Sequence, residues 1–221
     1  MAELTVYPDA NPESTTVDGR AMDTTSAAWA TIRAAAGDAA EDSTNPAYVV
    51  SLDGGASPNY VYFTRGMLLF DASAIPVSAT ITSVVFGLYV TAKQDNHGGM
   101  SVNIVASSPA SNTALAASDF ASAFTLNSDT KFSTAKTIAS ISTSAYSDWT
   151  LNASGIAHVQ TAIESDGIVK LGVRFEEDID NSAPTWNAGV SGIQTYFSEQ
   201  GSNKPRLVIN YKLPSGFFAI L

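Results

Sequence analysis

Acidic side chains gather at two places in the sequence where they could hold a cation. The segment EEDIDN at 176–181 carries four carboxylates in six residues, and Asp9, Glu13 and Asp18 follow one another near the N-terminus. Hard cations such as Ca²⁺ take several carboxylate and carbonyl oxygens, but neither group has the glycine and terminal glutamate of an EF-hand loop. We expect a solvated loop after a strand at 176–181 and no cofactor, with a structural calcium ion as the alternative.

Residues suited to acid–base or nucleophilic catalysis are few. The two histidines, His97 and His158, lie in a turn and on an expected helix, outside any catalytic motif. The sequence has no Gly-x-Ser-x-Gly turn, no His-Glu-x-x-His pair and no phosphate-cradling glycine loop. A glycosidase needs only two carboxylates at a suitable separation, so a hydrolase stays open as a third hypothesis. We expect that the protein is not an enzyme.

Tryptophan side chains are candidates for sugar binding, because a flat ring matches the apolar face of a pyranose while nearby polar groups satisfy its hydroxyls. Trp186 lies among loop-forming residues and is the candidate glycan platform. Trp29 and Trp149 lie in alternating apolar contexts. For all three, packing in the core or at a sheet edge is the alternative.

Residues 214–221 form an apolar tail after the last expected strand, with Phe217, Phe218, Ile220 and Leu221 beyond a proline and a glycine. An exposed tail of this kind is an aggregation liability unless something covers it. We predict that these four side chains dock into a partner subunit. The alternative is a tail that folds back onto its own domain.

Composition excludes several classes of partner. The formal net charge is −10, and the 11 Lys and Arg residues are spread singly, so there is no clustered positive surface for nucleic acid. The absence of cysteine excludes disulfides and thiolate zinc sites. The N-terminus lacks the basic and apolar regions of a secretory signal, and no apolar stretch reaches the roughly 20 residues of a membrane helix. We expect synthesis in the cytoplasm without a signal peptide and no membrane insertion.

Short strands joined by turns must position these side chains. Aromatic and β-branched residues, bounded by segments rich in Gly, Asn, Asp and Pro, predict strands. The stretch 79–92 is apolar on both faces in its second half, which predicts a central strand. Further strands are expected near residues 4 and 47 and at 60–71, 100–107, 146–152, 168–178, 192–200 and 205–213.

Helical spacing occurs at one place. Ile156, Val159 and Ile163 recur at helical intervals, Asn152 or Ser154 can cap the start, and Gly167 can end the helix. The stretch 26–40 is ambiguous, because alanine favours helix whereas Trp29 and Ile32 also suit a strand. We predict an extended edge segment there. With no linker or repeat visible, the sequence predicts one domain at 1–213, an all-β jelly-roll β-sandwich with one short helix.

Four segments in order resemble the DNRLRE-type jelly-roll domains, which are similar to carbohydrate-binding modules. That pattern ends a strand in Phe-Asp, continues through Ser-x-Ile-Pro, and closes on Ser-Glu followed by Pro-Arg-Leu-x-Val-x-Tyr. The matching residues are Phe70, Asp71, Ser73, Ile75 and Pro76, then Ser198, Glu199, Pro205, Arg206, Leu207, Ile209 and Tyr211. Within these motifs we interpret Arg65 with Asp71, and Glu199 with Arg206, as structural: Asp accepts turn amides and Arg pairs a neighbouring carboxylate.

The opening segment 7–19, together with 29–37, resembles a subgroup encoded in tailed-phage and virus-like genomes. This resemblance implies a non-enzymatic structural component of a phage-like virion, such as a decoration, tail-associated or fibre-like protein exposed on the particle surface. Its partners would be other virion proteins or copies of itself. The alternative is a carbohydrate-binding domain that mediates adhesion to surface glycans, because fold alone does not settle function.

Overall fold

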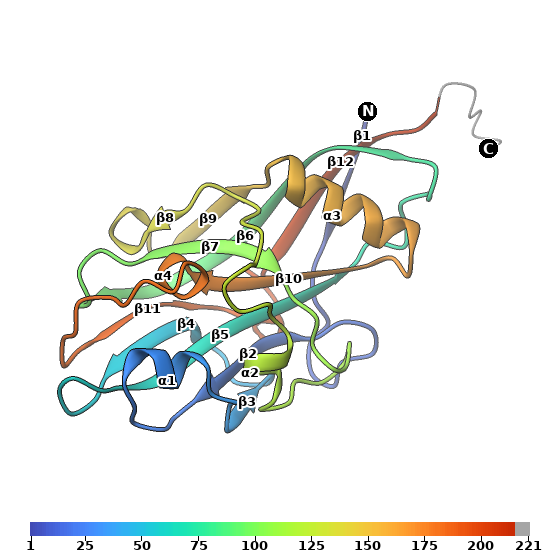
Figure 1. The fold of residues 1–221 in the computed structure, drawn as a ribbon. Helices are drawn as coiled ribbons and strands as arrows, with labels where there is room; N and C mark the ends of the chain where they lie inside the picture. The colour runs from blue at the N-terminus through green and yellow to red at the C-terminus, as the bar shows by residue number, and fades with distance from the viewer. Residues whose placement is uncertain (215–221) are drawn as a thin grey trace.

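The computed structural model of the chain describes residues 1–214, in which twelve strands form one large antiparallel sheet that curls into two layers (Figure 1). The main path through the sheet runs β1-β12-β6-β11-β4-β5-β10-β7-β8, with β2 paired to β5 and β9 paired to β6. The predicted fold class, an all-β sandwich, is confirmed, and the described chain has four α-helices where the sequence predicted one short helix. The strands are β1 (Ala2–Val6), β2 (Asp18–Asp23), β3 (Ala39–Glu41), β4 (Ala47–Gly54), β5 (Tyr60–Asp71), β6 (Thr80–Asp95), β7 (Ser101–Ala106), β8 (Lys136–Thr137), β9 (Ala145–Thr150), β10 (Ile168–Phe175), β11 (Val190–Thr195) and β12 (Arg206–Lys212).

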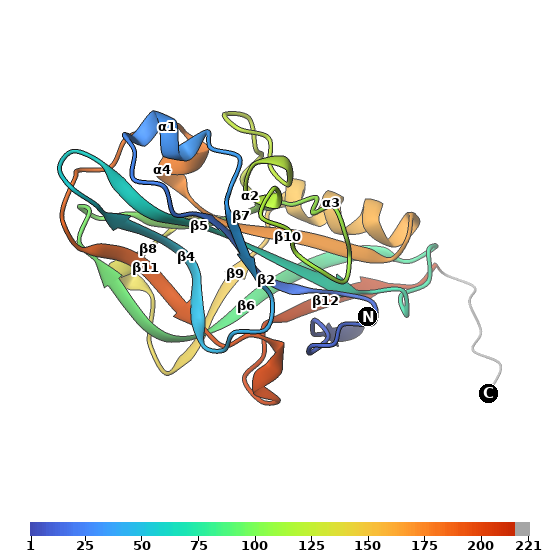
Figure 2. The same cartoon turned by 90° about the horizontal axis from the view of Figure 1, so that it is seen from below.

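The helices lie along one side of the sheet, as Figure 2 shows from below. Only one of those in the described chain exceeds five residues. Their bounds are α1 (Trp29–Arg33), α2 (Asp119–Ser122), α3 (Ala153–Glu164) and α4 (Glu176–Ile179), with 3₁₀ turns η1 (Ile138–Ser140) and η2 (Ser198–Gln200).

Strand β6 is central, as its two apolar faces predicted. It pairs with β12 and β11 along one edge and with β9 along the other. Val84, Phe86, Leu88 and Val90 alternate into the core and are fully buried. Phe86 contacts both Phe70 and Trp149, so the aromatic side chains of three strands meet between the layers.

Helix α3 confirms the predicted helical segment. The Asn152 side chain accepts hydrogen bonds from the backbone N–H groups of Ser154 (3.0 Å) and Gly155 (3.1 Å), which caps the N-terminus. Val159 and Ile163 are buried against the sheet. Gly167, whose φ is +79°, donates its N–H to the Ala162 carbonyl and ends the helix.

The prediction of an extended edge segment at 26–40 is wrong over 29–33. Helix α1 occupies these residues and buries Trp29, Ile32 and Arg33. The three lie at positions i, i+3 and i+4, which share one face of a helix but alternate faces of a strand. Trp29 packs on Phe63 and Tyr60 of β5. This contact favours the helix over an extended segment, and the helix propensity of alanine acts in the same direction.

Candidate functional site

A β-bulge in β5 turns Tyr62 out of the sheet. Ser51 of β4 pairs with Thr64, but the next pair is Asp53 with Val61, so two residues of β5 face one of β4. Tyr62 takes the extra position with φ of 54°, which is the left-handed region and uncommon for a bulky side chain. Tyr62 is 53% exposed. Bulges redirect side chains and are frequent beside functional sites.

Tyr62 borders a hollow of about 260 Å³ on the outer surface of four neighbouring strands. A second irregularity, between β4 and β11 at Tyr48 and Val50, places Tyr48 on the same surface as Ser51 and Asp53. The hollow therefore combines two phenol rings with several polar groups. Its lining residues are Arg20, Tyr48, Ser51, Asp53, Tyr62, Thr64 and Val190.

Some polar groups of this hollow already bind other protein groups, and others have no partner within the described chain. Arg20 binds the Glu41 carboxylate with Nε (3.1 Å) and Nη2, and its Nη1 donates to the Tyr48 carbonyl. Ser51 donates to the Thr64 hydroxyl at 3.0 Å. The Asp53 carboxylate and the two phenol hydroxyls have no hydrogen-bond partner within residues 1–214. Burial, and then the nearby Asp53 charge, raise the pKa of the Tyr48 phenol.

Strand β5 is held in place by a buried charge cluster. Arg65, fully buried on β5, forms a bidentate ion pair with Asp178 of α4. Its Nε donates to Oδ2 and its Nη2 to Oδ1, both at 2.8 Å. Arg174 also binds the Asp178 carboxylate (2.7 Å) and pairs with Asp129. Arg33 of α1 lies 3.2 Å from the same carboxylate. Burial alone would raise the pKa of Asp178, but Arg65 and Arg174 outweigh it and lower the value to about 2.

This cluster overturns the predicted solvated loop at 176–181. Residues 176–179 form helix α4, and Asp178 is the buried centre of the ion pairs, not a surface carboxylate. Arg174, four residues before Asp178, and the two distant residues Arg33 and Arg65 provide the compensating charge. The structural interpretation of Arg65 is confirmed with Asp178 as its partner, and Asp71 accepts the Ser73 amide as expected.

The second charged pair of the motif is not formed. Arg206 binds Asp148 of β9 with two contacts of 3.1 Å and lies over the Tyr146 ring, instead of pairing with Glu199. Glu199 follows Ser198 in η2 and accepts the Asn11 amide. Both residues therefore tie segments of the sandwich together.

Trp186 does not line the hollow. It is half-buried against the hydrophobic core, and its indole N–H donates to the Asn59 carbonyl at 2.8 Å. This placement agrees with the packing alternative, and its role as a glycan platform stays a prediction.

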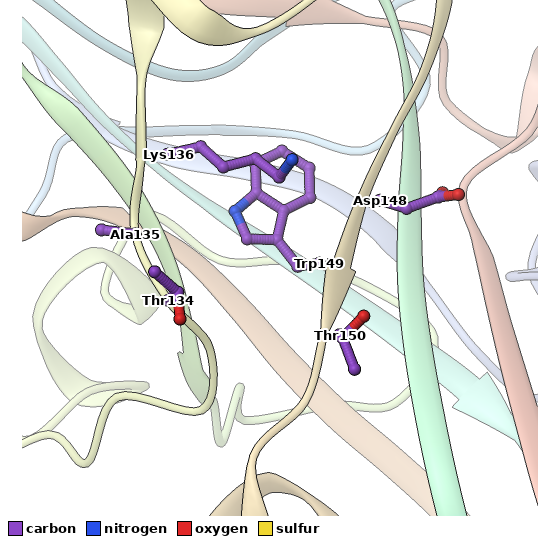
Figure 3. Close-up of a pocket in the computed structure, with 6 residues that line it drawn as sticks. All are labelled: Thr134, Ala135, Lys136, Asp148, Trp149 and Thr150. Carbon is purple, nitrogen blue, oxygen red and sulfur yellow. The ribbon is translucent and has the colours of Figure 1, made fainter.

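Trp149 lies beneath a different hollow, of about 270 Å³, between residues 134–136 and β9 (Figure 3). Figure 3 shows Lys136 extended over the indole, and its Nζ is 5.7 Å from the ring centroid. Because the Trp149 side chain is almost completely buried, this hollow offers a charged edge and no open aromatic face.

His97 is buried and His158 is partly buried. His97 Nδ1 lies 2.9 Å from the Ser191 hydroxyl, and His158 Nε2 lies 3.0 Å from the Lys170 carbonyl. Burial lowers the pKa of both imidazoles, which favours their neutral forms near pH 7. The Asp53 charge partly opposes the effect of burial on the pKa of His97, so this imidazole lies near the hollow carboxylate, whereas His158 lies on helix α3 and does not line the hollow.

The N-terminal acids act mainly as local structural acceptors. Asp9 Oδ2 accepts the amides of Ser14, Thr15 and Thr16, which closes the loop before β2. Asp18 is fully buried, and desolvation raises its pKa to about 8. Among residues 1–214, no group of three or more His, Asp or Glu side chains has an arrangement suited to a metal ion.

Sequence reasoning missed the residues that line the Tyr62 hollow. Tyr48 and Tyr62 lie in segments that predict ordinary strands, Asp53 begins the glycine-rich segment 53–59 that predicts a turn, and Arg20 belongs to no predicted strand. Tyr60 and Thr64 of β5 are buried, whereas Tyr62 between them is exposed, and no alternation of residue types in this segment predicts the change.

The docking residues Phe217, Phe218, Ile220 and Leu221 lie outside the described residues. No helix in residues 1–214 has the length and apolar character needed to cross a bilayer. No model of a known protein family matches the chain, and no curated protein matches it either. The resemblance to the jelly-roll domains therefore stays a prediction.

Proposed function

We propose that this protein is a non-enzymatic adhesion module that binds surface glycans in the Tyr48–Tyr62 hollow. The observation that carries the proposal is the left-handed, solvent-exposed Tyr62 at the β5 bulge. A residue held in a costly backbone conformation persists only where the surrounding structure enforces it, and such positions cluster at ligand sites. An exposed ring beside unoccupied polar groups suits the apolar face and hydroxyls of a sugar.

The carboxylate content of the hollow supports binding without hydrolysis. Asp53 is the single carboxylate among its lining residues. Glycosidases of the usual kind need an acid and a second carboxylate about 5–10 Å apart. Glu41, which lies beside the hollow residue Arg20, is already ion-paired with it. We therefore expect no turnover when the protein is incubated with a panel of polysaccharides.

We further propose that this module belongs to the surface of a phage-like particle, as a decoration, tail-associated or fibre-like component. The resemblance of segments 7–19 and 29–37 to phage-encoded proteins supports this location. Contact with other virion proteins or further copies would involve Phe217, Phe218, Ile220 and Leu221. Deleting residues 214–221 should leave a folded monomer that assembles poorly, as sedimentation would show. Unchanged assembly would contradict the proposed contact through these residues.

Glycan-array binding tests the proposed adhesion site. Wild-type protein should bind a subset of glycans, and Tyr62→Ala should weaken this binding at least tenfold, because it removes the exposed one of the two phenol rings that line the hollow. Tyr7→Ala is the matched control, since Tyr7 is a similarly exposed tyrosine (47%) outside that hollow. Trp186→Ala tests the tryptophan predicted from sequence. Loss of binding in either of these variants, with Tyr62→Ala unaffected, would contradict the assignment.

A further inference from the structure

We infer that the Tyr48–Tyr62 hollow selects uncharged sugars over acidic ones, and that Asp53 is the residue that sets this specificity. This inference rests on the glycan-binding function proposed above and names its ligand class. Three features support it. Arg20 is already paired with Glu41, Asp53 has no hydrogen-bond partner within the described chain, and the charged groups in and beside the hollow sum to a negative charge.

The arginine of the hollow is not free to bind an anion. Acidic sugars are commonly recognised by a guanidinium that donates two parallel hydrogen bonds to the carboxylate. Arg20 already directs Nε and Nη2 at Glu41 Oε2, and Nη1 donates to the Tyr48 carbonyl at 3.3 Å. A sugar carboxylate would have to displace Glu41, so the built-in acid competes with an acidic ligand.

The carboxylate of the hollow is free to bind hydroxyls. Asp53 is half-buried and, within the described chain, makes neither a hydrogen bond nor an ion pair. An ionised carboxylate only accepts hydrogen bonds and offers about four lone-pair sites. Two neighbouring sugar hydroxyls can donate to it together, whereas a uronic acid would be repelled. The phenol hydroxyls of Tyr48 and Tyr62 supply the complementary donors.

Charge balance acts in the same direction. The charges of Arg20 and Asp53 in the lining balance each other, and Glu41, which is paired with Arg20 beside the hollow, adds one more negative charge, so the three groups together carry −1. The whole chain carries −10. Both local and long-range fields therefore oppose an anionic ligand.

A paired titration tests this inference. The probes are neutral hexose oligosaccharides that bind on the array, and the same oligosaccharides carrying one uronic acid. Wild type should bind the neutral member at least tenfold tighter. Asp53→Asn should weaken neutral binding about tenfold and reduce the preference, because hydrogen bonds to a charged acceptor are the stronger ones. Glu41→Gln frees Arg20 and should tighten binding of the uronic-acid member about fivefold or more.

Glu3→Gln on β1 is the matched control, since it removes one negative charge away from the hollow and should change neither affinity. Circular dichroism and thermal unfolding check that every variant is folded. Preference of wild type for the acidic member, or an unchanged preference in Asp53→Asn, would overturn the inference while leaving glycan binding in place. Absence of binding to every glycan would instead reject the proposed function itself.

Discussion

At the scale of single residues, two features of the fold are unfavourable by themselves: the backbone conformation of Tyr62 and the buried charge of Asp178. Tyr62 accepts a left-handed backbone that costs a non-glycine residue roughly 1–2 kcal/mol. Asp178 and its arginines accept desolvation, which is repaid only when every partner is present. The backbone conformation of Tyr62 places its ring at the surface. The ion pair between Arg65 and Asp178 holds β5, the strand that carries Tyr62.

Replacing Tyr62 separates backbone strain from the role of the ring. Tyr62→Ala keeps the strained φ, whereas Tyr62→Gly relieves it, because glycine adopts positive φ without a steric penalty. We expect Tyr62→Gly to be more stable than Tyr62→Ala by up to about 1 kcal/mol in urea unfolding. Both variants should lose glycan binding equally. A Gly variant less stable than the Ala variant would show that the conformation is not strained.

Removing the charge of Asp178 should be among the most destabilising single changes. Asp178→Asn leaves buried Arg65 and Arg174 without their shared anion, and breaking a buried pair typically costs about 3–5 kcal/mol. Asp180→Asn is the control, because Asp180 lies on the surface and pairs with the half-exposed Lys131. We expect it to change the unfolding free energy by no more than about 0.5 kcal/mol. Equal effects in chemical denaturation would contradict the proposed role of the cluster.

At the scale of elements, boundaries depend on both local caps and distant contacts. Helix α3 begins and ends where its capping residues predicted. Strand β10 ends at Phe175 and β11 at Thr195, earlier than the predicted ends at 178 and 200. Helix α4 follows β10 directly because Asp178 is drawn to arginines from other elements. Local pattern locates an element, and tertiary contact decides its last residues.

Loss of the α3 cap should have a moderate effect. Asn152→Ala removes the acceptor of two backbone N–H groups and should lower the unfolding free energy by about 1 kcal/mol. Ser154→Ala is a suitable comparison, since the Ser154 side chain is exposed and is not the cap. Thermal or urea unfolding measures both. A negligible effect of Asn152→Ala would mean that packing on β6 and β10 alone holds the helix.

At the scale of the whole molecule, the two ends of the described chain are joined through Ser198. Its amide donates to Asp18 Oδ2 at 3.0 Å, and its hydroxyl donates to the Asp9 carbonyl at 2.6 Å and also contacts Asp18 Oδ1. Glu13 and Glu199 lie near Asp18, and their charges contribute to its raised pKa after the main effect of burial. The closure of the sandwich is therefore sensitive to the ionisation of one carboxyl group.

Stability should fall as the pH rises from about 4 to about 8. In this window the folded state keeps the Asp18 proton, whose pKa is about 8, whereas the unfolded state has lost it near 3.8. The unfolded state thus binds fewer protons, and the unfolding free energy decreases by up to about 1.4 kcal/mol per pH unit. Asp18→Asn should flatten this slope in urea unfolding, and the exposed Asp166→Asn should retain it. The same slope in Asp18→Asn would assign the effect to other groups.

The sequence by itself determined the elements whose cause is local: the alternation of the central strand β6, the cap and stop of α3, and an all-β sandwich without disulfides. Only the tertiary structure decided the hollow and the charge cluster. Tyr62 faces outward because one extra residue in β5 shifts the register against β4, and a shift by one residue exchanges the faces of a strand. Asp178 is buried because Arg33, Arg65 and Arg174 converge on it from α1, β5 and β10. Register and long-range charge pairing depend on which segments become neighbours, and no local pattern of residue types contains that information.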